Sequence, residues 1–142
     1  DLGYVGFPKK INNEIIETLI EQDFIPVIAP LGIGDDGRTY NINADTAAGS
    51  IASSLKAKRL LVLTDVEGVL DSNGDLVEEV NEEKIKTMVK TGEVSGGMIP
   101  KLSTCLESIN NGVTAAVIVD GRVKHAVLLE LFTDHGAGTL IR

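Results

Sequence analysis

The sequence is poor in aromatic residues and in cysteine. Its 142 residues include no Trp, two Tyr, three Phe and one Cys. A single Cys excludes an internal disulfide and fits a reducing compartment. Because aromatic side chains are so few, the core must be built from the aliphatic residues that dominate the 43% apolar fraction. Such cores are typical of parallel sheets covered by helices.

Basic residues are also scarce. Lys and Arg number 13 against 21 Asp and Glu, which gives a formal net charge of −8. This balance argues against sequence-independent nucleic-acid binding, which requires basic side chains on phosphates. No apolar run approaches the roughly 20 residues that span a bilayer, and no signal segment opens the chain. We therefore expect a cytoplasmic protein without nucleic-acid or membrane partners.

Short aliphatic runs alternate with segments of helical periodicity. The runs 24–30, 59–64 and 115–119 predict buried strands, and 139–141 predicts a last strand. Helices are expected over five segments: 11–20, 44–55, 81–92, 98–109 and 125–132. The Gly- and Asp-rich stretch 31–40 predicts a loop. The alternation predicts one α/β domain over residues 1–142, with a sheet covered on both sides.

The first of three polar loops lies at the start of an Ala-rich helical segment. It places Asn41, Asn43 and Asp45 within five residues of one another. Asn and Asp are common helix caps, so capping alone is one interpretation. The other is a polar contact with a substrate, with a carboxylate behind it. Open α/β sheets bind their ligands in loops of this kind.

A second polar loop, residues 63–71, follows a predicted buried strand. The strand runs into Thr64 and Asp65, and Gly68 would allow a ligand to approach the backbone closely. An ordinary turn after a strand is the alternative interpretation.

A third loop precedes the helical segment 98–109. Gly96 and Gly97 would expose backbone N–H groups at a helix start, where anions bind, and Lys101 about one turn further could contact a phosphate. The alternative is a flexible turn followed by a solvated lysine.

Other motifs for nucleotide or metal binding are either absent or lack the structural context that they require. Residues 32–37 fit G-x-G-x-x-G, but no apolar helix pattern begins there, so an acidic surface turn is predicted. The chain has no P-loop and no nucleophile elbow. His125 and His135 lack Cys or His partners at metal spacing, so no metal site is predicted. Cys105 lies on an apolar helical stripe and is expected in the core.

The order of five motifs resembles one family over nearly the whole chain. These motifs are YNINAD, LTDVEGVLD, SGGMIPK, IVDGR and LLELFTDHGAGTLIR. They resemble the C-terminal half of the N-acetylglutamate kinases, a branch of the amino acid kinase family. The resemblance implies a three-layer α/β/α sandwich with a mainly parallel sheet, of the amino acid kinase or carbamate kinase type. It also implies that this chain is the nucleotide-binding lobe only, without the N-terminal substrate lobe, and inactive alone.

The resemblance implies an activity and roles for particular residues. Members of this branch transfer a phosphoryl group from ATP, which carries Mg²⁺, to the γ-carboxylate of N-acetyl-L-glutamate in arginine biosynthesis. Lys101 would contact the transferring phosphoryl group, Asp45 would organise the catalytic lysines, and Asn41 would bind the substrate. The nucleotide-binding residues implied by the resemblance are Thr64, Asp65, Gly68, Val69, Glu93, Val94, Ser95 and Gly97.

The C-terminal run resembles that of the arginine-inhibited members. The resemblance implies an effector site for L-arginine, in which Glu130 would pair with the guanidinium while Gly136 and Gly138 would let the loop fold around it. A helix end and a Gly-rich turn before an edge strand is the plainer interpretation.

Two other functions stay open at this point. One is a different amino acid kinase, acting on aspartate, glutamate, carbamate or UMP. The other is a non-catalytic module that binds a nucleotide or arginine. The family further implies that the longer protein is a homo-oligomer.

Overall fold

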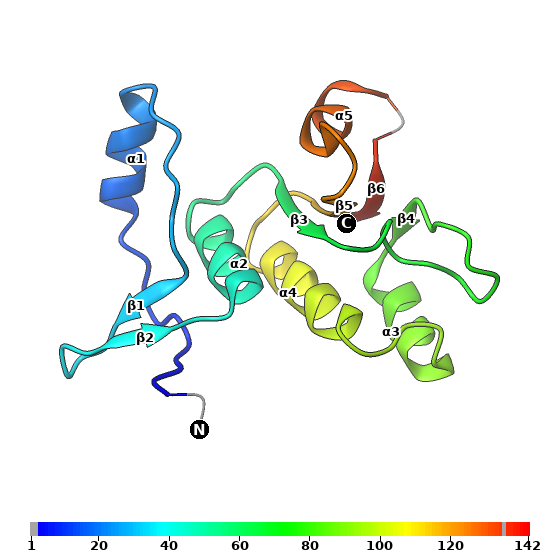
Figure 1. Ribbon diagram of the computed structural model, residues 1–142, viewed down its shortest axis with the longest axis horizontal. Helices are drawn as coiled ribbons and strands as arrows, with labels where there is room; N and C mark the ends of the chain where they lie inside the picture. Colours follow the sequence, from blue (N-terminus) through cyan, green and yellow to red (C-terminus); the bar gives the residue numbers. More distant parts are fainter. Residues whose placement is uncertain (1–2, 135) are drawn as a thin grey trace.

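The computed structural model describes residues 3–134 and 136–142 (Figure 1). The elements in chain order are α1 (Asn13–Glu21), β1 (Leu31–Ile33), β2 (Thr39–Asn41), α2 (Ala44–Ser54), β3 (Leu60–Thr64), β4 (Glu79–Val80), α3 (Glu82–Thr91), α4 (Met98–Asn110), β5 (Ala116–Asp120), α5 (Ala126–Phe132) and β6 (Gly138–Ile141). The segment with α1, β1 and β2 extends away from the other elements.

The main sheet has four strands in the order β3-β5-β6-β4. β3 pairs with β5 in parallel, and so does β4 with β6, whereas β5 and β6 are antiparallel. All of β5 is buried, as its uninterrupted aliphatic run predicts for a central strand. The prediction of a mainly parallel sheet is confirmed.

The side chains of β5 alternate between two apolar layers, because successive residues of a strand point to opposite faces. Ala116 and Ile118 belong to a large cluster that includes residues of α2, α3 and α4. Val117 and Val119 pack instead with Ala126 of α5. Figure 1 accordingly shows α5 on the opposite side of the strands from α2, α3 and α4. The predicted three-layer α/β/α arrangement is confirmed.

Local signals placed both ends of α3 correctly. The Oδ1 atom of Asn81 accepts a hydrogen bond from the N–H of Lys84 and so caps α3, and Gly92 ends this helix in the left-handed conformation at φ 81°. Cys105 is fully buried in α4, as expected, and burial raises the pKa of its thiol to about 12. No helix in the described part of the chain is long and apolar enough to cross a membrane.

The predicted strand over residues 24–30 is wrong. The run forms no strand, and its Ile25 and Val27 are 90% and 97% exposed. A strand exists only where a neighbouring backbone pairs with it, and no described strand pairs with this run. Apolar composition alone therefore predicts neither the pairing nor the burial of such a run.

The predicted loop over residues 31–40 is also partly wrong, because β1 and β2 form an antiparallel hairpin there. Each strand has only three residues, too few for a recognisable alternation. The Gly- and Asp-rich centre does form the predicted surface turn, in which the N–H of Gly34 donates to the carbonyl of Arg38 at 2.8 Å. The two-residue strand β4 was missed for the same reason of length.

Candidate functional site

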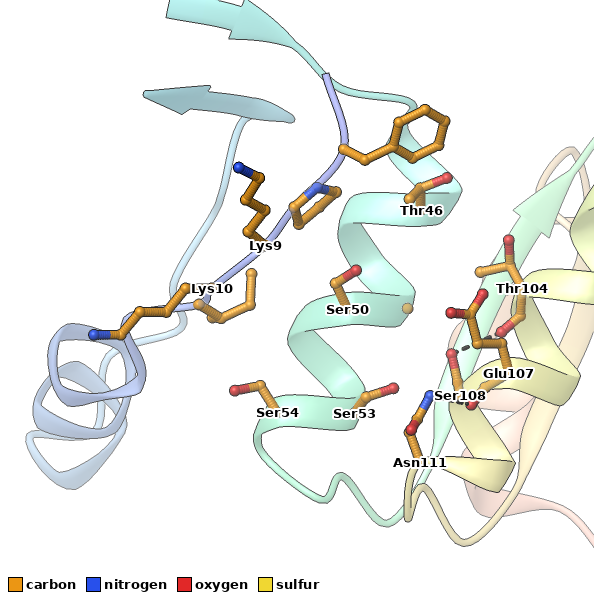
Figure 2. A pocket seen from close by; sticks show the side chains of 14 residues that line it. Lys9, Lys10, Thr46, Ser50, Ser53, Ser54, Thr104, Glu107, Ser108 and Asn111 are labelled. Carbon is orange, nitrogen blue, oxygen red and sulfur yellow. Dashed lines mark hydrogen bonds between the residues drawn. The ribbon is translucent and has the colours of Figure 1, made fainter. Parts of the chain in front are cut away.

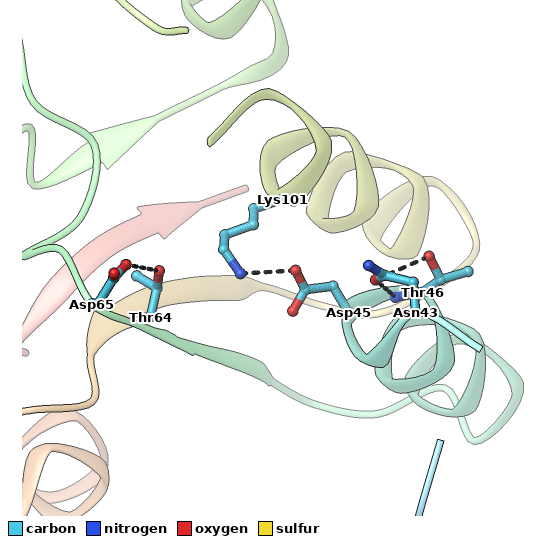
Figure 3. A network of polar contacts seen from close by, with 6 residues as sticks. All are labelled: Asn43, Asp45, Thr46, Thr64, Asp65 and Lys101. Carbon is cyan, nitrogen blue, oxygen red and sulfur yellow. Dashed lines mark hydrogen bonds and ion pairs between the residues drawn. The ribbon is translucent and has the colours of Figure 1, made fainter. Parts of the chain in front are cut away.

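The candidate site lies where β3 and β5 end. Thr64 and Asp120 are register partners at the last position of these two strands, and residues 65–69 leave the sheet from there. The helices α2 and α4 begin at the same edge (Figure 3). They pack closely because Gly49 has no side chain, since a Cβ there would lie 2.7 Å from Cγ2 of Thr104.

An ion pair joins the first turns of these two helices. The Nζ atom of Lys101 lies 2.8 Å from Oδ2 of Asp45 and donates a hydrogen bond to it. Their side chains are 22% and 28% exposed, so solvent screens the pair less than it screens a surface pair. Asp45 lies in the first turn of α2, where the helix dipole favours a carboxylate.

The two interpretations of the first polar loop apply to different residues. Asn43 is the helix cap, because its Oδ1 atom accepts a hydrogen bond from the N–H of Thr46 at 3.1 Å. Asp45 faces Lys101 instead, as Figure 3 shows. Asn41 is exposed on β2, and its N–H and carbonyl bond to the backbone of Tyr4 and Gly6.

A pocket of about 290 Å³ opens beside Lys101. The other predicted site residues that line it are Thr64, Asp65, Ser95 and Gly97, joined by Val66 and Met98. The second and third polar loops therefore meet in space although they are about 30 residues apart in the chain. No side chain caps the N-terminus of α4; the N–H groups of Met98 and Ile99 donate to the carbonyls of Ser95 and Gly96 instead, both at 3.3 Å, and Pro100 has no N–H.

Four of the predicted nucleotide residues do not line this pocket. Val69 and Val94 are buried in the core beneath the two loops, and Gly68 packs against Thr139 of β6. The exposed Glu93 accepts a hydrogen bond from the hydroxyl of Thr91 at 2.9 Å. These residues support the loops rather than face the pocket.

Of the candidate effector residues, Glu130 and Gly136 lie together. Its carboxylate is only 8% exposed; Oε2 accepts a hydrogen bond from the N–H of Ala137 at 2.8 Å, and Oε1 lies 3.5 Å from Nη1 of Arg59. Gly136 has φ 66°, and a Cβ there would lie 2.7 Å from Oε2 of Glu130. Gly138 packs on the backbone of β5, so a Cβ there would collide with the carbonyl oxygen of Ile118. His135 lies outside the described residues.

Sequence reasoning quoted the IVDGR motif but missed the ion pair within it. Arg122 donates from Nε and Nη2 to the two carboxylate oxygens of Asp120, at 2.9 and 2.8 Å. This bidentate contact holds the pKa of Asp120 at about 2. It also raises the pKa of Arg122, and the negative charges of Asp65 and Glu67 add to that increase. An Asp two residues before an Arg, at the end of a strand, was the available signal.

A larger cavity of about 580 Å³ lies elsewhere, between residues 7–11 and the helices α2 and α4 (Figure 2). Hydroxyl groups dominate its wall, among them Ser50 and Ser53 of α2 and Thr104 of α4. It includes none of the predicted site residues and no buried ion pair. Within residues 3–134 and 136–142, no group of three or more His, Cys, Asp or Glu could hold a metal ion.

Comparison with known proteins agrees with this fold. The model of the Amino acid kinase family matches residues 1–120, and the chain belongs to this family. Among curated relatives, the acetylglutamate kinases of Parvibaculum lavamentivorans and Gluconobacter oxydans are 61% and 58% identical to it over 142 residues. These matches cover 100% of the chain but 47% and 48% of the relatives, so the chain spans about half their length. The resemblance recognised in the motifs is confirmed.

Solved structures support the same fold. N-acetylglutamate synthase from Neisseria gonorrhoeae, complexed with coenzyme A and L-arginine, matches with a TM-score of 0.91 and 28% identity over 99% of this chain and 33% of that chain. Carbamate kinase from Giardia lamblia bound to AMP-PNP matches with a TM-score of 0.71 over 96% of this chain and 46% of that chain. At 22% identity, the second match shows the fold alone.

Proposed function

We propose that this chain is the nucleotide-binding lobe of an acetylglutamate kinase, which transfers a phosphoryl group from MgATP to the γ-carboxylate of N-acetyl-L-glutamate. The observation that carries the proposal is the ion pair between Asp45 and Lys101, which lines the pocket, in a chain 61% identical to an acetylglutamate kinase. That identity favours this activity over the other amino acid kinases. The role in arginine biosynthesis and a homo-oligomeric whole protein are parts of the same proposal.

Phosphoryl transfer leaves little covalent chemistry to the protein, so positioning and charge stabilisation dominate. In this proposal the ammonium of Lys101 contacts the transferring phosphoryl group and offsets the charge that develops on it. Asp45 orients that ammonium, because its Oδ2 atom accepts a hydrogen bond from Nζ at 2.8 Å. The attacking carboxylate is already ionised at neutral pH and needs no general base.

The nucleotide would occupy the pocket between the two loops. Thr64 and Asp65 would contact it from the β3 side, while Ser95, Gly97 and Lys101 would contact its phosphates. A Cβ on Gly97 would meet no atom within 4 Å, which leaves open space beside the helix start. ATP would bring Mg²⁺ with it, and the magnesium ion would offset phosphate charge.

The substrate would lie on the α2 side of Lys101. Asn41 is exposed on β2, and its side-chain amide makes no hydrogen bond to another residue of the described chain. In the proposal this amide binds N-acetyl-L-glutamate. Asn43, by contrast, is occupied as the cap of α2.

Glu130 supports a second, regulatory role, the binding of L-arginine. A carboxylate that is 8% exposed and 3.5 Å from a guanidinium nitrogen of Arg59 offers the chemistry that recognises free arginine. The synthase that resembles this chain was crystallised with L-arginine. Free arginine would take the place of Arg59 against Glu130.

A chimeric kinase tests the proposed activity. In it, this chain replaces the matching 142 residues of the Parvibaculum lavamentivorans enzyme. The chimera is assayed with MgATP and a panel of acceptors: N-acetyl-L-glutamate, aspartate, glutamate, carbamate and UMP. We expect turnover with N-acetyl-L-glutamate alone. Turnover with another acceptor would favour a different amino acid kinase, and ATP binding by a folded chimera without any turnover would favour a non-catalytic module.

A further inference from the structure

Thr139 of β6 contacts the backbone of the loop that follows β3. Its side chain is fully buried, and its Oγ1 atom accepts a hydrogen bond from the N–H of Val69 at 2.8 Å, across 70 residues of chain. Val69 is buried as well, so water cannot replace this acceptor. The neighbouring Gly68 has φ 153°, and a Cβ there would lie 2.6 Å from the same oxygen. The loop therefore lies so close to β6 that a residue with a side chain would collide with Thr139 at the position of Gly68.

This contact fixes one end of the segment that lines the pocket. At its start, Thr64 is held in the parallel ladder between β3 and β5. At its end, the carbonyl of Val69 accepts from the N–H of Val77, and the N–H of Val69 donates to Thr139. Asp65 and Val66, which line the pocket, lie between these two anchors.

Thr139 itself cannot retreat from the loop. It follows Gly138, which packs on the carbonyl oxygen of Ile118, and its register partner in β5 is Ile118. β6 is therefore tightly seated on the central strand. The hydroxyl of Thr139 is a fixed acceptor to which the loop must adapt.

From this geometry we infer that Thr139 is a positioning residue for nucleotide binding: its hydroxyl holds the 65–69 loop in the conformation that receives the nucleotide. The inference rests on the proposed function, because it assigns a task to the pocket described there. The hydroxyl, rather than the bulk of the side chain, carries this role. Without it the N–H of Val69 stays buried and unpaired, and the loop must move to reach another acceptor.

Three variants of the chain separate the hydroxyl from packing. Thr139→Val keeps the shape and removes the acceptor, while Thr139→Ser keeps the acceptor and removes a methyl group. Thr87→Val makes the same chemical change on the exposed side of α3, where the hydroxyl bonds only to the carbonyl of Glu83. For each variant, calorimetry gives the dissociation constant for MgATP, thermal melting gives stability, and hydrogen exchange gives the protection of the Val69 amide.

We expect Thr139→Val to weaken MgATP binding roughly five- to tenfold, which corresponds to one lost hydrogen bond. The Val69 amide should lose protection in this variant, whereas the nearby Leu140 amide, which bonds to Glu78 at 2.8 Å, should keep it. Thr139→Ser and Thr87→Val should bind MgATP within about twofold of the parent chain.

Equal binding by Thr139→Val and the parent chain would overturn the inference, as would unchanged protection of Val69. Equal weakening in Thr139→Val and Thr139→Ser would overturn it too, because packing by the methyl group would then be the cause. If the folded parent chain binds no MgATP at all, the proposed function fails first, and the inference falls with it. The parent chain therefore shows which of the two has failed.

Discussion

Lys101 and Asp45 are 56 residues apart in the chain, yet Nζ of the first lies 2.8 Å from Oδ2 of the second. The two residues meet because α2 and α4 begin at the same edge of the sheet and pack closely through Gly49. The contact is partly shielded from solvent, and its lysine lines the pocket. A lysine held in this way by a carboxylate is oriented, and charge stabilisation of a transferring phosphoryl group requires a fixed orientation.

Replacing Lys101 should affect the rate more than nucleotide binding. In the chimeric kinase, Lys101→Ala is expected to lower kcat on the order of a hundred- to a thousandfold, because a charge that acts in the transition state is lost. The KM for ATP should change less than about threefold. Steady-state kinetics measures both quantities.

Lys86 supplies the matched control. It forms an equally short ion pair of 2.7 Å with Glu82, but on the exposed surface of α3. Lys86→Ala should leave kcat unchanged and change stability little, because solvent screens this exposed pair. Equal rates for the two alanine variants would mean that Lys101 is an ordinary solvated helix residue.

Asp45 and Asn43 should separate catalysis from helix stability. Asn43 is the cap of α2, so Asn43→Ala is expected to cost about 1 kcal/mol of unfolding free energy. Asp45→Asn leaves that cap intact and removes only the charge facing Lys101, so the melting temperature should change little while turnover falls sharply. A thermal melt and a kinase assay on both chimera variants measure this split. Unchanged turnover in Asp45→Asn would remove Asp45 from the proposed machinery.

Elements with local signals could be predicted from the sequence. The central strand β5 is an aliphatic run long enough to be unambiguous, and α3 carries both its cap, Asn81, and its terminating Gly92. Residues 24–30 have an equally clear apolar signal, yet they form no strand, because pairing depends on a second segment that the run itself does not specify. The short strands β1, β2 and β4 are below the length at which alternation can be recognised.

The candidate site also combines features that the sequence could indicate with contacts that it could not. Gly96, Gly97 and Lys101 indicated an anion site because their chemistry is local. No spacing rule, however, links Asp45 to Lys101 or Val69 to Thr139, since these contacts depend on how distant elements pack. The resemblance to known kinases suggested the first contact, and only the structure revealed the second.

Gly68 and Gly97 should respond differently to an added methyl group. At Gly68, φ is 153° and a Cβ would lie 2.6 Å from Oγ1 of Thr139 and 2.7 Å from Cδ1 of Leu76. Gly68→Ala is therefore expected to cost about 1–3 kcal/mol, through overpacking and backbone strain. Gly97 has φ −67° and open space around it, so Gly97→Ala should change stability by less than about 1 kcal/mol. Denaturant unfolding of the two variants measures the difference, and similar losses would contradict the close approach of the loop to β6.

The ion pair between Asp120 and Arg122 should make stability depend on pH in the acid range. Arg122 holds the pKa of Asp120 at about 2, below its ordinary value of 3.8. Because the folded state lowers this pKa, the pair stabilises the protein above about pH 4, and its contribution is lost as the pH falls towards 2. The difference in melting temperature between the parent chain and Asp120→Asn should therefore be largest above pH 4, shrink as the pH falls towards 2 and vanish only below pH 2. Asp35→Asn removes the same charge from a fully exposed side chain and should leave the melting temperature unchanged throughout. A difference for Asp120→Asn that persists undiminished at pH 2 would show that the variant acts through packing and not through the charge of Asp120.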